Sequence, residues 1–269
     1  MTAPQLPDGL PFYLGTMSFS HADWVGAVYP PSLPQQQYLA HYAKYFNAVE
    51  IDSTFYGTPR VETVKRWAQV TPPDFCICVK TPRAITHEMR LVNALGQMDA
   101  FVRTMHALEE KLGAILIQFG PDFTVSEFDI LDDFLSRLPG NTRYAVEFRH
   151  KSWAKRKTSE MLLSHNASWV STHYTIMPRM VHQTANFLYL RWIGVHKQFS
   201  VKNRIQKDMT DALVWWRDQL LDALDGKKAV YGFFNNDFAG FSPASCNQMK
   251  GLLGLPVRHP RVPKQATLF

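Results

Sequence analysis

The sequence has few cysteines, and they form no recognisable pattern. Three occur in 269 residues, Cys76, Cys78 and Cys246, and this odd number at this spacing excludes a disulfide framework and a zinc ribbon. No apolar run approaches the roughly 18 residues of a membrane-spanning helix, and residues 1–10 lack the basic and apolar segments of a signal peptide. We therefore expect a cytoplasmic protein without a membrane partner.

The sequence also lacks an internal linker, because no long Ser/Gly-rich stretch and no long stretch of single-sign charge divides it. Its 46% hydrophobic and 13% aromatic content is sufficient for one large core. Its length fits an α/β barrel, whose usual size is about 250 residues. We predict a single barrel domain at 1–255 and a flexible basic tail at 256–269.

Short apolar runs alternate with helical patterns along the chain. Strands are expected at 12–16, 47–52, 75–80, 113–119, 143–149, 168–172, 187–191 and 229–235, and helices at 38–46, 61–68, 95–112, 128–138, 158–165, 210–224 and 242–253. Runs this apolar are typical of a parallel sheet covered on both faces, and eight strands favour an α/β fold of the (β/α)8 TIM type. No Gly-x-Gly-x-x-Gly or Walker-type loop follows the first strand, which disfavours the common nucleotide-binding folds.

Four motifs carry a family resemblance. They are residues 46–56 (FNAVEIDSTFY), 79–87 (VKTPRAITH), 147–153 (EFRHKSW) and 231–237 (YGFFNND). With them the chain resembles the YecE-like family, catalogued as domain of unknown function seventy-two, over nearly its whole length. The resemblance implies a TIM-type barrel and no established activity. Phe19, Ile193 and Phe241 stand where we expect a Trp and two His of that family, so we expect no mechanism that depends on those histidines.

Polar side chains end six of the expected strands, and parallel α/β sheets bind ligands at the carboxyl ends of their strands. Because side chains two residues apart leave one face of a strand, Glu50 and Asp52 share a face, as do Glu147 and Arg149. Glu50 has two open interpretations, an ion pair with Lys80 on the neighbouring strand or a functional role. The pair Glu147 and Arg149 also has two open interpretations, a functional role or a network that stabilises the rim of the barrel.

The candidate site residues fall into three groups by their chemistry. General acid–base chemistry points to Glu147, Glu50 and His150. Binding of an anionic substrate points to Lys80, Arg83, Arg149, Arg191, Asn235, Asn236 and Trp153. A divalent Zn, Mn or Mg ion would take the hard ligands Asp52, Glu50, Glu147 and Asp237, although their spacing is not diagnostic.

The chain is basic, with a formal net charge of +6 and a pI of about 9.2. This charge is compatible with nucleic acid, phosphorylated small molecules or anionic membranes. Two basic stretches stand out, residues 149–157 around Trp153 and residues 197–207. They fit nucleic-acid binding, and they equally fit two solvated loops.

The tail at 256–269 (PVRHPRVPKQATLF) is rich in proline and basic, with no acidic residue. Within it, Gln265, Leu268 and Phe269 resemble the peptide by which many bacterial replication and repair proteins dock on the DNA sliding clamp. The alternative is that Leu268 and Phe269 pack back onto the barrel.

Three functions remain open from the sequence. The first is a metal-assisted phosphodiesterase that acts on a phosphate-containing ligand, with nucleic acid the favoured one. The second is a non-catalytic module that binds nucleic acid or an anionic metabolite and is recruited to the sliding clamp. The third is a sugar-phosphate isomerase or lyase, because barrels host many reactions. The sequence thus leaves open whether the protein is an enzyme.

Overall fold

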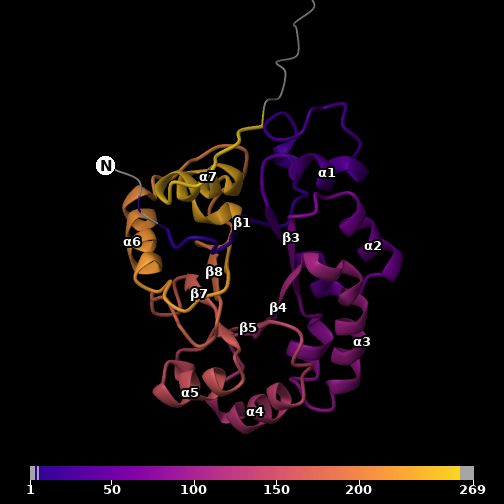
Figure 1. The fold of residues 1–269 in the computed structure, drawn as a ribbon, viewed down its shortest axis with the longest axis vertical. Helices are drawn as coiled ribbons and strands as arrows, with labels where there is room; N and C mark the ends of the chain where they lie inside the picture. The colour runs from indigo at the N-terminus through magenta and orange to yellow at the C-terminus, as the bar shows by residue number, and fades with distance from the viewer. Residues whose placement is uncertain (1–3, 5, 261–269) are drawn as a thin grey trace, which may run out of the picture.

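Nine parallel strands form one sheet at the centre of the protein (Figure 1). The computed structural model describes residue 4 and residues 6–260. The strands are β1 (Phe12–Met17), β2 (Ala48–Ile51), β3 (Cys76–Lys80), β4 (Leu112–Gln118), β5 (Tyr144–Glu147), β6 (Ser168–Trp169), β7 (Ser171–His173), β8 (Leu188–Trp192) and β9 (Val230–Phe234). Each of the eight expected strands is therefore present, although one of them is divided.

The sheet nearly closes on itself through one stretch of chain. Its hydrogen-bonded order is β6-β5-β4-β3-β2-β1-β9-β8-β7, and Val170 alone separates the two end strands in the sequence. β6 pairs with β5, whereas β7 pairs with β8. The expected strand at 168–172 is divided because its first part bonds to one neighbour and its second part to the other. The result is an α/β fold built on a nearly closed parallel barrel.

Helices form the outer ring around the strands (Figure 1). Within the described chain they are α1 (Tyr38–Tyr42), α2 (Val61–Gln69), α3 (Leu95–Met105), α4 (Phe128–Ser136), α5 (Arg156–Ser164), α6 (Thr210–Leu221) and α7 (Ser242–Leu252). Between β7 and β8 the chain runs as a loop, residues 174–187, without a helix. None of the helices in the described chain has the length and apolar character that crossing a bilayer requires.

The strands separate two apolar clusters. Side chains on the outer face, such as Val49, Ile77 and Val146, pack with the helices. Side chains on the inner face, such as Ala48 and Cys78, fill the barrel. Alternation along a strand explains this division, because successive side chains point to opposite faces.

The interior changes from apolar to charged toward the carboxyl ends of the strands. The next inner positions after Ala48, Cys78, Ala145 and Tyr189 carry charged side chains. They are Glu50, Lys80, Glu147 and Arg191, on β2, β3, β5 and β8 respectively. The two-residue period of the strands thus directs four charged groups into one space.

Candidate functional site

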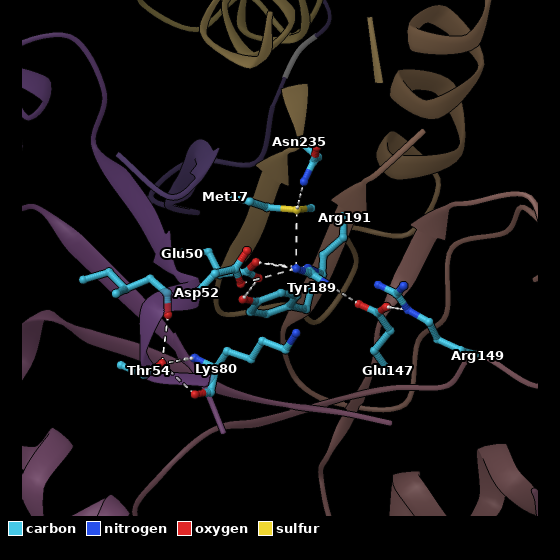
Figure 2. A network of polar contacts seen from close by, with 11 residues as sticks. Met17, Glu50, Asp52, Thr54, Lys80, Glu147, Arg149, Tyr189, Arg191 and Asn235 are labelled. Atoms are coloured by element: carbon cyan, nitrogen blue, oxygen red, sulfur yellow. Dashed lines mark hydrogen bonds and ion pairs between the residues drawn. The ribbon is translucent and has the colours of Figure 1, made fainter. Parts of the chain in front are cut away.

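Arg191 lies at the centre of a buried network at the carboxyl ends of the strands (Figure 2). Its Nε and Nη2 lie 3.1 and 2.7 Å from Glu50 Oε1, and its Nη1 lies 2.5 Å from Glu147 Oε2. Nη2 also lies 3.4 Å from Met17 Sδ, and the Tyr189 hydroxyl donates to Glu50 Oε2 at 2.6 Å. All five residues are buried. Buried charges need partners, and every guanidinium nitrogen of Arg191 has one.

Glu147 has a second cation beside it. Arg149 Nε donates to Glu147 Oε1 at 2.8 Å, so the two residues that share a strand face form an ion pair. The guanidinium carbon of Arg149 lies 4.6 Å from the ring centroid of Tyr174. In residues 4 and 6–260, the two terminal nitrogens of Arg149 have no protein acceptor.

The two buried glutamates differ in proton affinity because they share the cations unequally. Burial disfavours the ionised form of Glu147, but Arg191 and Arg149 outweigh burial and lower its pKa to about 2. Burial raises the pKa of Glu50 to about 7, since Glu50 shares Arg191 with Glu147 and has Asp52 as a negative neighbour. Near neutral pH, Glu147 is therefore ionised while Glu50 exchanges a proton.

Lys80 completes the charged set but stands apart from the ion pairs. Burial lowers its pKa, while the nearby charge of Asp52 opposes that shift. Its Nζ lies 3.9 Å from the ring centroid of Phe55, and its backbone is fixed by Thr54, whose Oγ1 accepts from Lys80 N at 3.1 Å and donates to Lys80 O at 2.6 Å. Among the described residues, Lys80 Nζ has no hydrogen-bond or ion-pair partner.

Of the two interpretations of Glu50, the ion pair with Lys80 is therefore wrong. The strands are neighbours, as predicted, but Glu50 lies level with Cys78 in the register. Lys80 is one inner position further toward the carboxyl end, so Glu50 meets Arg191 from across the barrel instead.

Asp52 and Asn235 lie at the edge of the network. Asp52 Oδ1 lies 3.6 Å from Arg191 Nη2, and about a third of its side chain is exposed. Asn235 Nδ2 lies 3.7 Å from Met17 Sδ, and its Oδ1 accepts from Asp237 N at 2.9 Å. Both residues thus adjoin the predicted site, with weaker contacts than the glutamates.

Three candidates for substrate binding lie outside the Arg191 network. Trp153 is fully buried and donates from Nε1 to Phe123 O at 2.9 Å, so it belongs to the core. Asn236 Oδ1 accepts from Trp24 Nε1 and from Ser242 N and Oγ at 3.3, 3.0 and 2.8 Å, so this amide holds the start of α7. Arg83 is exposed and lies 3.6 Å from Glu88 Oε1. The structure thus gives a ligand no access to Trp153.

His150 and Asp237 also lie outside the Arg191 network. His150 Nδ1 accepts from Ser152 N at 3.2 Å and caps the turn at Lys151–Trp153. The Asp237 carboxylate is paired with Lys202 Nζ at 2.8 Å and accepts from Lys197 N at 3.2 Å. Of the three expected acid–base residues, the Arg191 network therefore contains the two glutamates.

The expected metal ligands do not gather around one point. Glu50 and Glu147 face Arg191, whereas Asp237 faces Lys202. In the part of the chain that the structure describes, no three His, Cys, Asp or Glu side chains are grouped so that they could hold a metal ion. In the described residues the four carboxylates therefore do not form one group, because the buried guanidinium of Arg191 lies between Glu50 and Glu147.

Sequence reasoning missed three residues of this region. Tyr189 lies two residues before Arg191 on β8, so the same alternation that placed Arg191 also indicates Tyr189. Met17 and Tyr174 gave no comparable signal, since their contacts with the arginines depend on how distant segments meet. Gln265, Leu268 and Phe269, the expected clamp-binding residues, lie outside the described residues.

Comparisons with known proteins identify relatives over most of the chain. A family model described as "Protein of unknown function DUF72" matches residues 13–267. UPF0759 protein YecE of Escherichia coli K12 is 32% identical over 152 residues, or 56% of this chain, and in that match the chain spans about half (53%) of YecE. UPF0759 protein YunF of Bacillus subtilis is 25% identical, covering 96% of this chain and 99% of YunF.

Solved structures show the same fold. A DUF72 family protein from Thermotoga maritima is 28% identical with a TM-score of 0.75, covering 91% of this chain and 99% of that one. A DUF72 family protein from Enterococcus faecalis is 23% identical with a TM-score of 0.74, covering 94% and 99%. The family model, which spans nearly all of the described barrel, shows that the chain belongs to the YecE-like DUF72 family.

Proposed function

We propose that the protein binds a phosphate-containing ligand at the carboxyl face of the barrel through Lys80 and Arg149. The observation that carries this proposal is a difference among the three cations of the network. Arg191 has acceptors for all its guanidinium nitrogens. Among the described residues, the Lys80 ammonium and the terminal nitrogens of Arg149 have none. Such cations are available to a phosphate, which guanidinium and ammonium groups bind well.

The barrel type supports this location. We infer a (β/α)8 TIM-type barrel in which residues 168–173 serve as one strand that bonds to both neighbours. TIM-type barrels carry their active sites at the carboxyl ends of the strands. Lys80 is the last residue of β3, and Arg149 follows β5 by two residues.

Nucleic acid is the ligand class that we favour. Tyr56 follows β2 on the same face as Lys80 and is 88% exposed. Its ring contacts Phe55, over which Lys80 Nζ lies. Exposed aromatic rings next to cations are the common means by which proteins bind single-stranded nucleic acid, since bases stack on the ring while the cation meets the phosphate.

The structure supports binding better than metal-assisted hydrolysis. The expected phosphodiesterase requires carboxylates around a metal, and in the described chain Glu50 and Glu147 are already paired with Arg191. We therefore propose a binding module as the first function.

A second candidate is a sugar-phosphate isomerase or lyase. The observation that favours it is the proximity of two groups suited to proton transfer, Glu50 with a pKa of about 7 and Lys80, whose pKa is lowered by burial. Proton exchange at the carbon next to the carbonyl of a ketose phosphate, followed in deuterium oxide by NMR, tests this candidate. If the wild type exchanges the proton no faster than the Lys80→Ala variant does, this candidate is rejected.

The binding proposal is tested with a labelled 12-nucleotide single strand and fluorescence anisotropy. We expect the double variant Lys80→Ala/Arg149→Ala to bind at least tenfold more weakly than the wild type. Loss of two phosphate contacts should also reduce the slope of log K against log salt concentration by about 1.4, at roughly 0.7 per contact. The matched control Lys65→Ala/Arg137→Ala removes the same charge from α2 and from the end of α4, where both residues are exposed.

Two outcomes would contradict the proposal. One is an equal loss of affinity in the control pair, which would mean that net charge alone explains the weaker binding. The other is unchanged affinity in Lys80→Ala alone. This single variant keeps the test valid even if Arg149→Ala disturbs folding, because the Lys80 ammonium has no partner in the described chain to lose.

We further propose that Gln265, Leu268 and Phe269 recruit the barrel to the DNA sliding clamp. What supports this is the sequence QATLF at 265–269. Recruitment would raise the local concentration of a DNA-binding barrel at its ligand without any new contact in the barrel.

A further inference from the structure

A pocket lies at the carboxyl ends of β7 and β8, outside the Arg191 network. Its volume is about 160 Å³, and its polar lining includes His173, Arg179, Gln198 and Lys207. Tyr174 also lines it, and Arg149 lies over the ring of that tyrosine. The pocket therefore adjoins the proposed ligand site without sharing its two cations.

The lining of this pocket is cationic and contains no carboxylate. In the described part of the chain, neither Arg179 nor Lys207 takes part in an ion pair. The Arg179 guanidinium carbon lies 4.1 Å from the ring centroid of Trp215, which orients it. The carboxylate of Asp237, at the end of the neighbouring strand, is paired with Lys202. The positive charge in the pocket is thus not compensated by these groups.

His173 adds a neutral donor. Trp216 Nε1 donates to His173 Nδ1 at 3.0 Å. Burial, together with the nearby charges of Arg179 and Lys207, lowers the pKa of His173 to about 4. At neutral pH the ring is therefore uncharged with its hydrogen on Nε2, and no described residue accepts that hydrogen.

We propose that this pocket binds a phosphate group, free or as a monoester, between Arg179, Lys207 and the Nε2–H of His173. A phosphate offers acceptors in several directions, which suits donors that come from the segment after β7 and from the segment before α6. The cavity is large enough for one phosphate and too small for a nucleotide. The site is additional to the one proposed at Lys80 and Arg149, and it does not depend on that function.

Isothermal titration calorimetry with inorganic phosphate at constant ionic strength tests the pocket. We expect Arg179→Gln/Lys207→Gln to weaken phosphate binding at least tenfold. The control Lys65→Gln/Arg137→Gln, with the same change in charge, should bind as the wild type does. All four side chains are exposed or on the surface of helices, so we expect these variants to fold. A parallel titration with glycerol 3-phosphate distinguishes a monoester site, which binds it more tightly, from a site for free phosphate.

NMR gives a local readout. The imidazole signals of His173, assigned with His173→Gln, should shift on addition of phosphate in the wild type and in Lys80→Ala/Arg149→Ala, but not in Arg179→Gln/Lys207→Gln. Equal phosphate affinity in the wild type and the pocket variant would overturn the proposal, as would a His173 signal that does not move. Because the Lys80 and Arg149 pair is tested with the oligonucleotide, failure of that function is seen separately.

Discussion

Arg191 connects strands that are not neighbours in the sheet. From β8 it reaches Glu50 on β2 and Glu147 on β5. A carboxylate buried without a cation costs several kcal/mol, so the position of this guanidinium determines whether both glutamates can remain inside. The network is therefore important for stability as well as for the site.

We predict that Arg191→Met destabilises the protein by about 3–5 kcal/mol, because it leaves two buried carboxylates short of a cation. Urea unfolding measures the effect. Arg137→Met removes an exposed arginine that is paired with Asp133 on the surface, and it should change stability by less than about 1 kcal/mol. Adding Glu50→Gln to Arg191→Met should recover part of the loss. An Arg191 variant as stable as the Arg137 variant would contradict the network.

Glu50 should give the folded protein a characteristic pH dependence. Its folded pKa is raised from 4.5 to about 7, so between these values the folded state holds a proton that the unfolded state releases. The free energy of unfolding must then fall as pH rises from about 4.5 to about 7, by roughly 3 kcal/mol for a shift of this size.

The comparison of wild type with Glu50→Gln isolates this effect, because other titrating groups cancel in the difference. Urea unfolding between pH 5 and pH 8 should show the wild type losing stability relative to the variant as pH rises. Glu147→Gln serves as the opposite case. Since its folded pKa is lowered to about 2, Glu147 contributes stability above about pH 4.5 that is lost as pH falls toward 2. A pH-independent difference for Glu50→Gln would refute the raised pKa.

At the residue scale, the sequence predicted which side chains face the mouth of the barrel but not how they pair. Alternation along a strand is local, so Glu50, Glu147 and Arg191 could be placed from spacing alone. Their pairing depends on the level of each residue in the sheet and on contacts across the barrel, which local pattern does not contain. Trp153 was expected to contact a ligand because it lies in a basic stretch. Its ring is instead fully buried.

At the scale of elements, the loop after β8 is held close to the segment after β9. Gly194 has φ +79°, and a Cβ at this position would lie 2.1 Å from Asp237 O. Gly194 also lines the pocket proposed for phosphate. The residue therefore allows a close approach that shapes one wall of that pocket.

We predict that Gly194→Ala destabilises the protein by clearly more than about 2 kcal/mol, because the collision with Asp237 adds to the cost of the positive φ. Gly226 is the matched control, since it has φ +68° and nothing within 4 Å of a Cβ. Gly226→Ala should show the backbone cost alone, of about 1–2 kcal/mol. Thermal unfolding of both variants measures the difference, and equal losses would show that the contact with Asp237 relaxes freely.

Most elements were predictable because each strand is a short apolar run and each helix has an apolar period. The division of 168–173 into β6 and β7 was not, because it arises from a change of bonding partner within one short extended stretch. The loop at 174–187 in place of a helix agrees with the sequence, in which no helix was expected there.

For the whole molecule, the sequence identified the family and the α/β architecture, whereas the chemistry of the site depends on contacts between distant segments. The family motifs and the number of strands indicate the fold. Among the described residues Arg191 is fully paired and Lys80 is not, a distinction on which the proposed binding of a ligand depends. We therefore expect the barrel and residues 265–269 to act as separable parts.

Deletion of residues 265–269 tests this separation. The truncated chain should unfold at the same urea concentration as the full chain and bind the 12-nucleotide strand with equal affinity, because the proposed contacts all lie within the barrel. It should lose binding to a purified bacterial sliding clamp, measured by surface plasmon resonance. The full-length variant Gln265→Ala/Leu268→Ala/Phe269→Ala should behave like the truncation. This result would show that the clamp recognises the three side chains and not the length of the chain. If the truncated chain binds the clamp as well as the full chain does, recruitment through these residues is wrong. If it instead unfolds at a lower urea concentration, Leu268 and Phe269 pack on the barrel, since removal of buried apolar side chains is what lowers stability.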